Sequence, residues 1–419
     1  MGRYESRLWE GDPAGSTRAE RRPCRYDAYI PTPLTGAAFD LPASLAADLV
    51  DVEQAVRHLN DQHPGLANLE PLARFLLRAE AVASSNIEGL VLNVRRLARS
   101  EAAQREGLPV NDETAKAVLG NIHALDEALD RAADPRRSVT IDDLTAIHTA
   151  LLIGTRDQRW AGVVRTEQNW IGGANPCAAA FVPPPEQDVP ELLDDLARYL
   201  SEDDHPALLQ AALAHAQFET IHPFADGNGR TGRALIQLVL RRRGVATRVL
   251  PPVSLVLATE VGRYVSALDA TRGEGDTTAS QLAWLELFLS ATGRACRDAS
   301  RFADDLVALE AGARTGLGAV RRNSATDLLV AALPSLPVFS VTTAAAHIGR
   351  SFQATSDAVA RLVEADVVRQ VTLGRRNRAF EAVGLFEAFT GFERALASPE
   401  ADTLVAPPKR PVPARSKKH

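Results

Sequence analysis

The chain has 419 residues, of which 45% are hydrophobic and 24% charged, a composition typical of a soluble globular protein with more than one core. Its net charge of −6 excludes a protein coated in basic surface, so any nucleic-acid contact must come from a local patch. The sequence has no apolar run of secretory-signal length and no stretch of about 18 residues apolar enough to span a bilayer, which predicts a cytoplasmic protein with no membrane partner. Three widely spaced cysteines are expected to be free thiols in a reducing compartment: Cys24, Cys177 and Cys296.

The N-terminal third is predicted to be mainly helical. Residues 1–45 contain several prolines and are expected to form an extended lead-in that packs on the body. From 46 to 135, apolar residues recur at three- and four-residue steps, which indicates amphipathic helices. One of these helices is expected over about 70–89, ending at Gly89, because glycine suits the left-handed position just after a helix.

Residues 136–310 are predicted to form a second helical region. Helical periodicity is interrupted at 154–185, where glycines and prolines favour a loop with a short hairpin. A second interruption runs from His222 to Gly229, between two predicted helices. Residues 311–323, which combine glycines with arginines, are expected to be a linker.

The C-terminal part has its own pattern. Residues 324–395 indicate three short helices followed by two strands that flank the turn Gly374-Arg375-Arg376-Asn377. Residues 398–419 are rich in proline and are predicted to be disordered. The fold class expected for the whole chain is mainly α, with a short β-hairpin in the core and a small mixed C-terminal domain.

The segment IHPFADGNGRTGR, from Ile221 to Arg233, combines many chemically useful residues. A helix N-terminus offers unpaired backbone N–H groups and a partial positive charge, which together attract anions. Gly227 and Gly229, on either side of Asn228, allow the backbone to approach a phosphate closely. The segment therefore predicts a phosphate site, with a solvated surface loop as the alternative interpretation; no Lys-Ser/Thr follows the glycines, which excludes a Walker loop.

The charged residues of this segment fit a polyphosphate. Arg230 and Arg233 share a face of the predicted helix, where cations oppose the helix dipole at a cost of about 0.3–1 kcal/mol each. A bound polyphosphate would reverse that cost. Asp226 supplies one hard oxygen ligand suited to Mg²⁺, and His222 titrates near neutrality, so it can accept a proton from an attacking hydroxyl.

The same segment resembles the Fic motif, HPFx(D/E)GNGRxxR, at every specified position. The resemblance implies a protein adenylyltransferase that moves AMP from ATP to a hydroxyl of an unknown target protein, with residues 136–310 as its catalytic core. It implies that His222 is the general base, that Asp226 holds Mg²⁺, and that Phe224 anchors the loop. The residues implied to bind ATP are Gly227, Asn228, Gly229, Arg230 and Arg233. The hairpin near 169–185 resembles the family's flap, which aligns the target chain; Arg165, Trp170 and Phe181 are candidates to line it, with a structural role as the alternative.

A second resemblance concerns regulation. Ser84, Glu88 and Gly89 match the Fic inhibitory motif, (S/T)xxxE(G/N), and stand before the main motif, as in the N-terminally inhibited class. Glu88 is expected in the last turn of its helix, where the dipole disfavours an anion. The resemblance implies that Glu88 pairs with Arg233 and blocks the seat of the γ-phosphate.

The C-terminal pattern resembles a winged helix-turn-helix, which recurs behind Fic domains. Arg375, Arg376 and Arg378 on the predicted wing are candidates to contact DNA phosphates, and docking to a protein is the alternative. The residues that could reach base edges are Ser351, Gln353, Thr355 and Ser356. Two other functions stay open at this stage: a DNA-binding regulator whose Fic domain only senses nucleotide, and removal of AMP from a modified target at the same site. A homodimer is also compatible with the sequence.

Overall fold

The structure, a computed structural model, describes residues 2–15, 17–61, 65–66, 69–272, 277–373 and 377–397. The chain divides into two compact units. Unit 1 comprises Met1–Glu53, Gly120–Val245 and Gly262–Ser290, and unit 2 comprises Gln54–Leu119, Ala246–Val261 and Ala291–His419. Helices α2 (Ala43–Asn60), α5 (Glu113–Arg131) and α12 (Thr277–Leu317) contribute residues to both units, and so does α11 (Val261–Ala270) through its first residue.

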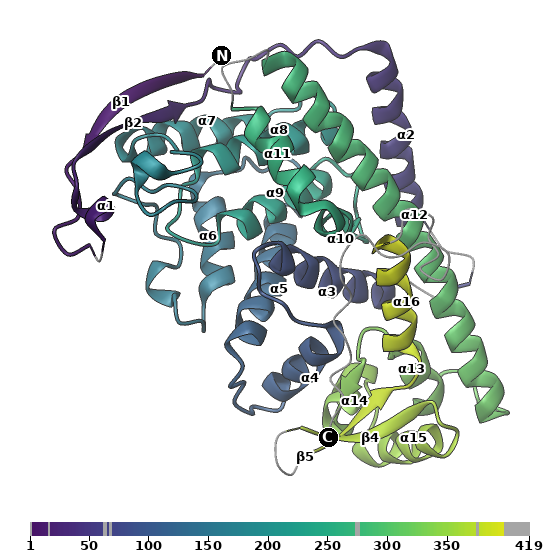
Figure 1. The fold of residues 1–419 in the computed structure, drawn as a ribbon. Coiled ribbons are helices and arrows are strands. Elements are labelled where there is room, and N and C mark those ends of the chain that lie inside the picture. Colours follow the sequence, from purple (N-terminus) through teal and green to yellow (C-terminus); the bar gives the residue numbers. More distant parts are fainter. Residues whose placement is uncertain are drawn as a thin grey trace. The chain divides into compact units, whose positions relative to one another are not determined.

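Unit 1 opens with a β-hairpin that the sequence did not reveal. Strands β1 (Arg3–Trp9) and β2 (Cys24–Ile30) pair antiparallel, and helix α1 (Arg18–Arg21) lies in their connection (Figure 1). The expected extended lead-in is therefore a paired sheet over much of its length. The remaining helical elements of unit 1 are α6 (Ile141–Leu152), η1 (Gln158–Trp160), η2 (Pro176–Ala178), η3 (Glu186–Asp188), α7 (Val189–Ser201), α8 (Ala207–Ile221), α9 (Asn228–Arg242) and α11 (Val261–Ala270).

Helix α8 forms the centre of unit 1. All of its residues from Ala207 to Ile221 are buried, polar side chains such as His215 included, so the helix has no solvent-exposed face. It packs along α9 and α7, and the indole N–H of Trp284 donates to the Ala212 carbonyl at 2.9 Å. Helix α8 therefore lies directly alongside α9, the helix that follows it in the chain.

Unit 2 combines helices with a small sheet. Its helices are α3 (Glu70–Ile87), α4 (Val94–Arg105), α10 (Val253–Leu257), η4 (Ala258–Glu260), α13 (Ala325–Ala332), α14 (Val341–Ile348), α15 (Phe352–Glu364) and α16 (Leu385–Ala397). The sheet consists of β3 (Val338–Phe339), β5 (Asn377–Ala382) and β4 (Val368–Leu373) in the order β3-β5-β4, with antiparallel pairing throughout. The mainly helical fold expected from the sequence is confirmed.

Two buried clusters hold the C-terminal elements against the helices of unit 2. The ring of Phe75 on α3 lies 5.1 Å from that of Phe302 and 5.2 Å from that of Phe389. The carboxylate of Glu381 on β5 is fully buried and accepts from Arg99 of α4 at 2.7 Å. A buried carboxylate needs such cationic partners to offset its desolvation, so this contact also fixes α4.

Other expectations are corrected by the structure. Helix α12 continues to Leu317, so residues 311–317 of the linker expected at 311–323 are helical. Gly312 and Gly316 do not prevent this, because a glycine weakens a helix by only about 1 kcal/mol. Cys24 and Cys177 form a disulfide, so the expectation of three free thiols is wrong for this pair. Disulfides are typical of oxidising compartments, so this one argues against the cytoplasmic assignment, which stays a prediction. The expected disordered tail, 398–419, lies outside the described residues.

No helix in the described part of the chain combines the length and the apolar character that a bilayer crossing requires.

Candidate functional site

The candidate site is the loop that joins α8 to α9. His222 caps the end of α8 with φ of 48°, in the left-handed region that side chains other than glycine seldom adopt. Its carbonyl accepts from the Arg165 Nε at 2.9 Å and from the Asn169 Nδ2 at 3.1 Å. Such a conformation persists only where its surroundings hold it, and it is common at functional sites. The hydrogen bonds from Arg165 and Asn169 therefore hold the backbone that carries the His222 imidazole.

Asn228 closes this loop on itself. Its Oδ1 accepts from the Phe224 backbone N–H at 2.9 Å, and its Nδ2 donates to the Phe224 carbonyl at 2.8 Å. Both polar atoms of the side chain are thus used within the loop. If Asn228 contributes to an anion site, it does so through its backbone. Gly227, with φ of +79°, is the N-cap of α9, and a Cβ there would lie 2.8 Å from a methyl of Leu151. Only glycine fits both constraints.

His148, which the sequence did not single out, supports the loop from α6. Its ring stacks on that of Phe224 with centroids 3.7 Å apart. The Gly162 backbone N–H donates to Nδ1 at 3.0 Å, so Nε2 carries the proton and donates to the Asp226 carbonyl at 2.9 Å. Burial lowers the pKa of His148 to about 4, so the ring is neutral at pH 7. His148 is a positioning residue for Phe224 and Asp226.

The first turns of α9 carry the two expected arginines. Arg230 and Arg233 are both buried, at 4% and 2% relative exposure, in a place where the helix dipole opposes cations. The Asp226 side chain is exposed, and its Oδ2 lies 3.4 Å from the Arg230 Nη2. Cationic side chains, a helix N-terminus and an exposed carboxylate together suit a phosphate group with a metal ion.

The donor set fits Mg²⁺ in one specific way. No group of three or more His, Cys, Asp or Glu side chains among the described residues could hold a metal. Mg²⁺ commonly uses one or two carboxylates together with substrate phosphates and water. Asp226, exposed beside the N-terminus of α9, fits that mode, and it would bind the ion together with a nucleotide rather than alone.

Close packing of α8 on α9 sets the position of the arginines. A Cβ at Gly232 would lie 2.7 Å from the Glu219 Oε1 and 3.1 Å from the His215 Nδ1, so a larger residue at this unspecified position of the motif would make these neighbours shift. The Nε2 of His215 lies 2.7 Å from the Tyr264 hydroxyl. Burial, followed by the charge of Arg233, lowers the pKa of His215 to about 3, so it stays neutral beside that arginine.

The expected hairpin is present next to the loop. Ile171 and Phe181 form an antiparallel bridge, with the Ile171 N–H donating to the Phe181 carbonyl at 2.9 Å. Strand β2 adds to it, because the Tyr29 N–H donates to the Val182 carbonyl at 2.9 Å. The disulfide between Cys24 and Cys177 joins the same two segments. A backbone hydrogen bond and a disulfide therefore link the hairpin of β1 and β2 to the hairpin that contains Ile171 and Phe181.

Arg165 and Phe181 have structural roles here. The Arg165 guanidinium donates to the Pro184 carbonyl at 2.6 Å and the Ile221 carbonyl at 3.3 Å, besides its bond to His222. The Arg272 guanidinium lies 4.4 Å from the centre of the Phe181 ring, and its Nε donates to the Thr220 hydroxyl at 3.1 Å. Both arginines link the hairpin to the end of α8, and neither link was visible in the sequence.

The predicted inhibitory residues belong to unit 2. Ser84 is buried in α3, and Glu88, the C-cap of that helix, is exposed. Gly89 has φ of +79°, as expected for the residue that ends a helix. Arg233 belongs to unit 1, so the pairing of Glu88 with Arg233 stays a prediction.

Of the proposed DNA contacts, Arg375 and Arg376 lie outside the described residues. Arg378 is exposed on β5, with its guanidinium 4.9 Å from the Phe380 ring centre. Thr355 is fully buried and its hydroxyl donates to the Ser351 carbonyl at 2.9 Å, so the expectation that it reaches a base edge is wrong. Ser351 caps α15, while Gln353 is exposed. DNA binding, the winged-helix assignment and a homodimer remain predictions.

The candidate site lies within a segment that matches a known protein family. Residues 138–240 match the Fic/DOC family, and residues 46–130 match the Fic/DOC family N-terminal region. Protein adenylyltransferase fic-1 of Caenorhabditis briggsae is 34% identical over 139 residues, 32% of this chain and 25% of that relative. Protein adenylyltransferase Fic of Drosophila melanogaster is 35% identical over 117 residues, 27% of this chain and 22% of that relative. The chain thus spans about a quarter of the length of the curated relatives it matches.

Among solved structures, a Fic family protein from Desulfovibrio desulfuricans G20 superposes with a TM-score of 0.51. Its sequence is 22% identical, and the match covers 83% of this chain and 98% of that one. At this level of identity the likeness concerns the fold alone.

Proposed function

We propose an activity from the premise that the chain is a Fic/DOC family protein, with the family domain at residues 138–240: it transfers AMP from ATP to a hydroxyl side chain of another protein. Membership of the family implies a nucleotide substrate and a protein target. One observation carries the proposal. The loop that presents His222 in a left-handed conformation leads directly into the N-terminus of α9, where two buried arginines lie. A proton acceptor and a polyphosphate seat are thereby adjacent. The relatives' names, which describe protein adenylyltransferases, support the same reaction.

The reaction divides among the residues as follows. The target hydroxyl oxygen attacks the α-phosphorus, its proton passes to the His222 imidazole, and the bond from the α-phosphorus to the bridging oxygen breaks to release pyrophosphate. Arg230 and Arg233, with the N–H groups at the start of α9, hold the phosphates and stabilise their charge. Asp226 would hold Mg²⁺, which when bound neutralises phosphate charge. Most of the rate gain comes from positioning and charge stabilisation, so the rigidity of the loop matters.

We also propose that Glu88 restrains this reaction. It ends α3 as an exposed anion at a helix C-terminus, while Arg233 is a cation near a helix N-terminus; each location is unfavourable, and pairing would relieve both. An Arg233 so engaged cannot bind the γ-phosphate in the productive position.

The test uses ATP labelled at the α-phosphate, with purified protein and a cell lysate as the source of targets. The label should enter protein with Glu88→Gly, and His222→Ala in that background should lower incorporation by about 10²–10⁴ while nucleotide binding persists. Equal incorporation with and without His222 would refute the base assignment. Loss of label from a modified protein on adding the wild-type chain would instead favour the reverse reaction.

A further inference from the structure

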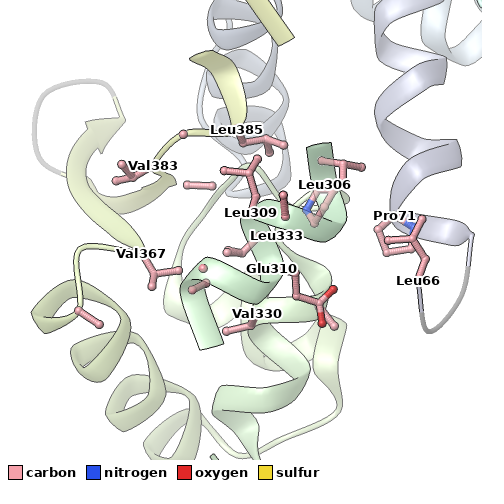
Figure 2. Close-up of a pocket in the computed structure, with 18 of the residues that line it drawn as sticks. Leu66, Pro71, Leu306, Leu309, Glu310, Val330, Leu333, Val367, Val383 and Leu385 are labelled. Carbon is pink, nitrogen blue, oxygen red and sulfur yellow. The ribbon is translucent and has the colours of Figure 1, made fainter. Parts of the chain in front are cut away.

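Unit 2 contains a cavity of about 360 Å³ that the proposed reaction does not use. Its walls come from stretches far apart in the sequence, including the first turn of α3, the last turns of α12 and the end of α13 (Figure 2). The short segments after α15 and β5 complete it. The principal side chains are Pro71, Leu306, Leu309, Val330, Leu333 and Leu385.

The lining limits the chemistry of a ligand. Among the described residues that line it, the apolar side chains are all aliphatic and none is aromatic or basic. Glu310 and Asp366 are the charged residues of this described lining. The Glu310 Oε1 pairs with the Arg314 Nη2 at 2.7 Å, whereas Asp366 is exposed. The walls therefore favour an aliphatic body, and the acidic edge favours an uncharged or positively charged head group over an anion.

The volume limits the size of a ligand. A closed apolar cavity of about 150 Å³ holds one benzene molecule, so a cavity of 360 Å³ suits roughly 10–20 non-hydrogen atoms. This is within the range of about 300–1,000 Å³ for small-molecule sites.

The cavity is tied to α3, the helix that ends at Glu88. Pro71 stands in the first turn of α3 and lines the cavity directly. Arg78, about two turns further along α3, is buried. It donates to the Pro334 carbonyl at 3.4 Å and to the Ser335 carbonyl at 2.7 Å. Pro334 is itself part of the wall. Any shift of the end of α13 on filling the cavity is therefore transmitted to α3 through a buried, charged contact.

We propose that this cavity binds a small aliphatic molecule with an uncharged or cationic head group, and that its occupancy is sensed by α3. Through α3, occupancy of the cavity would regulate AMP transfer, and this regulatory part of the proposal rests on the restraint by Glu88 proposed above. A ligand that binds two arrangements of α3 unequally shifts the balance between them by its difference in affinity, which is the requirement for an effector.

The binding test uses the full chain and three unbranched probes of eight carbons each: octylammonium, octan-1-ol and octanoate. Octylammonium and octan-1-ol should each raise the unfolding midpoint by about 2–5 °C at saturation, and octanoate by less than about 1 °C. Ala331→Leu, which fills the cavity from α13, should abolish the rise. Ala346→Leu is the matched control, because Ala346 is exposed on α14 and does not line the cavity.

If Ala331→Leu fails to fold, Asp366→Asn replaces it. Asparagine tolerates the left-handed backbone of this position, where φ is 57°. This variant should bind octan-1-ol as before and, with the acidic charge removed, should show a larger shift with octanoate than the wild type does. Equal shifts by all three probes, or shifts that persist in Ala331→Leu, would overturn the site.

Coupling to α3 is measured by amide hydrogen exchange of residues 70–89. Octylammonium should slow exchange in this segment by at least about threefold in the wild type and in Ala346→Leu, and not in Ala331→Leu. Unchanged exchange despite binding would overturn the coupling. Because neither measurement needs ATP, binding without any AMP transfer would count against the proposed function alone, and AMP transfer without binding would count against the cavity alone.

Discussion

Arg165 should hold the catalytic loop, and replacing it by methionine tests this directly. The substitution keeps the length of the aliphatic stem and removes the guanidinium. In the structure that group donates to four carbonyls: those of His222 at 2.9 Å, Glu167 at 3.1 Å, Pro184 at 2.6 Å and Ile221 at 3.3 Å. The side chain that makes them is buried, so water cannot replace the lost bonds.

The expected magnitude follows from two opposing terms. Hydrogen bonds to a charged group contribute about 1.5 kcal/mol each at the low end, or about 6 kcal/mol for the four. Burial lowers the pKa of Arg165 to about 10, which corresponds to roughly 3 kcal/mol of desolvation. The net loss in the free energy of unfolding should therefore be about 3 kcal/mol. A displaced His222 should also slow AMP transfer by about 10²-fold.

Urea unfolding at pH 7.5 and label transfer in the Glu88→Gly background measure the two effects. Arg156→Met is the matched control, because the Arg156 side chain is 84% exposed and should change the stability by less than about 0.5 kcal/mol. Arg165→Lys should recover part of the stability and little of the rate, since an ammonium cannot span the same carbonyls. A stability and a rate within error of the wild type for Arg165→Met would refute the reasoning that this residue holds the loop.

Three further predictions follow. Glu88→Gly should raise AMP transfer at least about tenfold, and the double variant with Arg233→Ala should behave like Arg233→Ala alone; additive effects would contradict the pairing. The pKa of His148 is about 4 in the folded protein against an ordinary 6.5, so below pH 6.5 the unfolded chain takes up a proton that the folded protein does not. The free energy of unfolding should therefore be at its full value above pH 6.5 and fall by about 3 kcal/mol towards pH 4 in urea titrations. His148→Gln should reduce this pH dependence. Reduction of the disulfide between Cys24 and Cys177 should lower the free energy of unfolding by about 2–4 kcal/mol, and Cys24→Ser should abolish that response to reductant; an equal response in the variant would place the effect elsewhere.

The elements that local patterns specify were predictable from the sequence. The end of α3 at Gly89 and the break between α8 and α9 follow from apolar periodicity and from glycines that terminate or begin helices. In the C-terminal region the three short helices and the two strands flanking the turn at 374–377 are present as predicted, whereas the short strand β3 was not predicted. The residues of the Fic motif were identified for the same reason, because the whole motif is contiguous.

The supports of the site were decided only by the tertiary structure. Arg165 contacts a carbonyl 57 residues away in sequence, and His148 contacts one 78 residues away, and neither stands in a distinctive local pattern. The hairpin of β1 and β2 was missed because strand formation depends on a partner strand, and these two strands pair across the segment that contains α1. The sequence by itself thus determined which residues are the candidates for the proposed chemistry, since they are neighbours along the chain. What holds them in place arises from packing between remote segments, which no local pattern encodes.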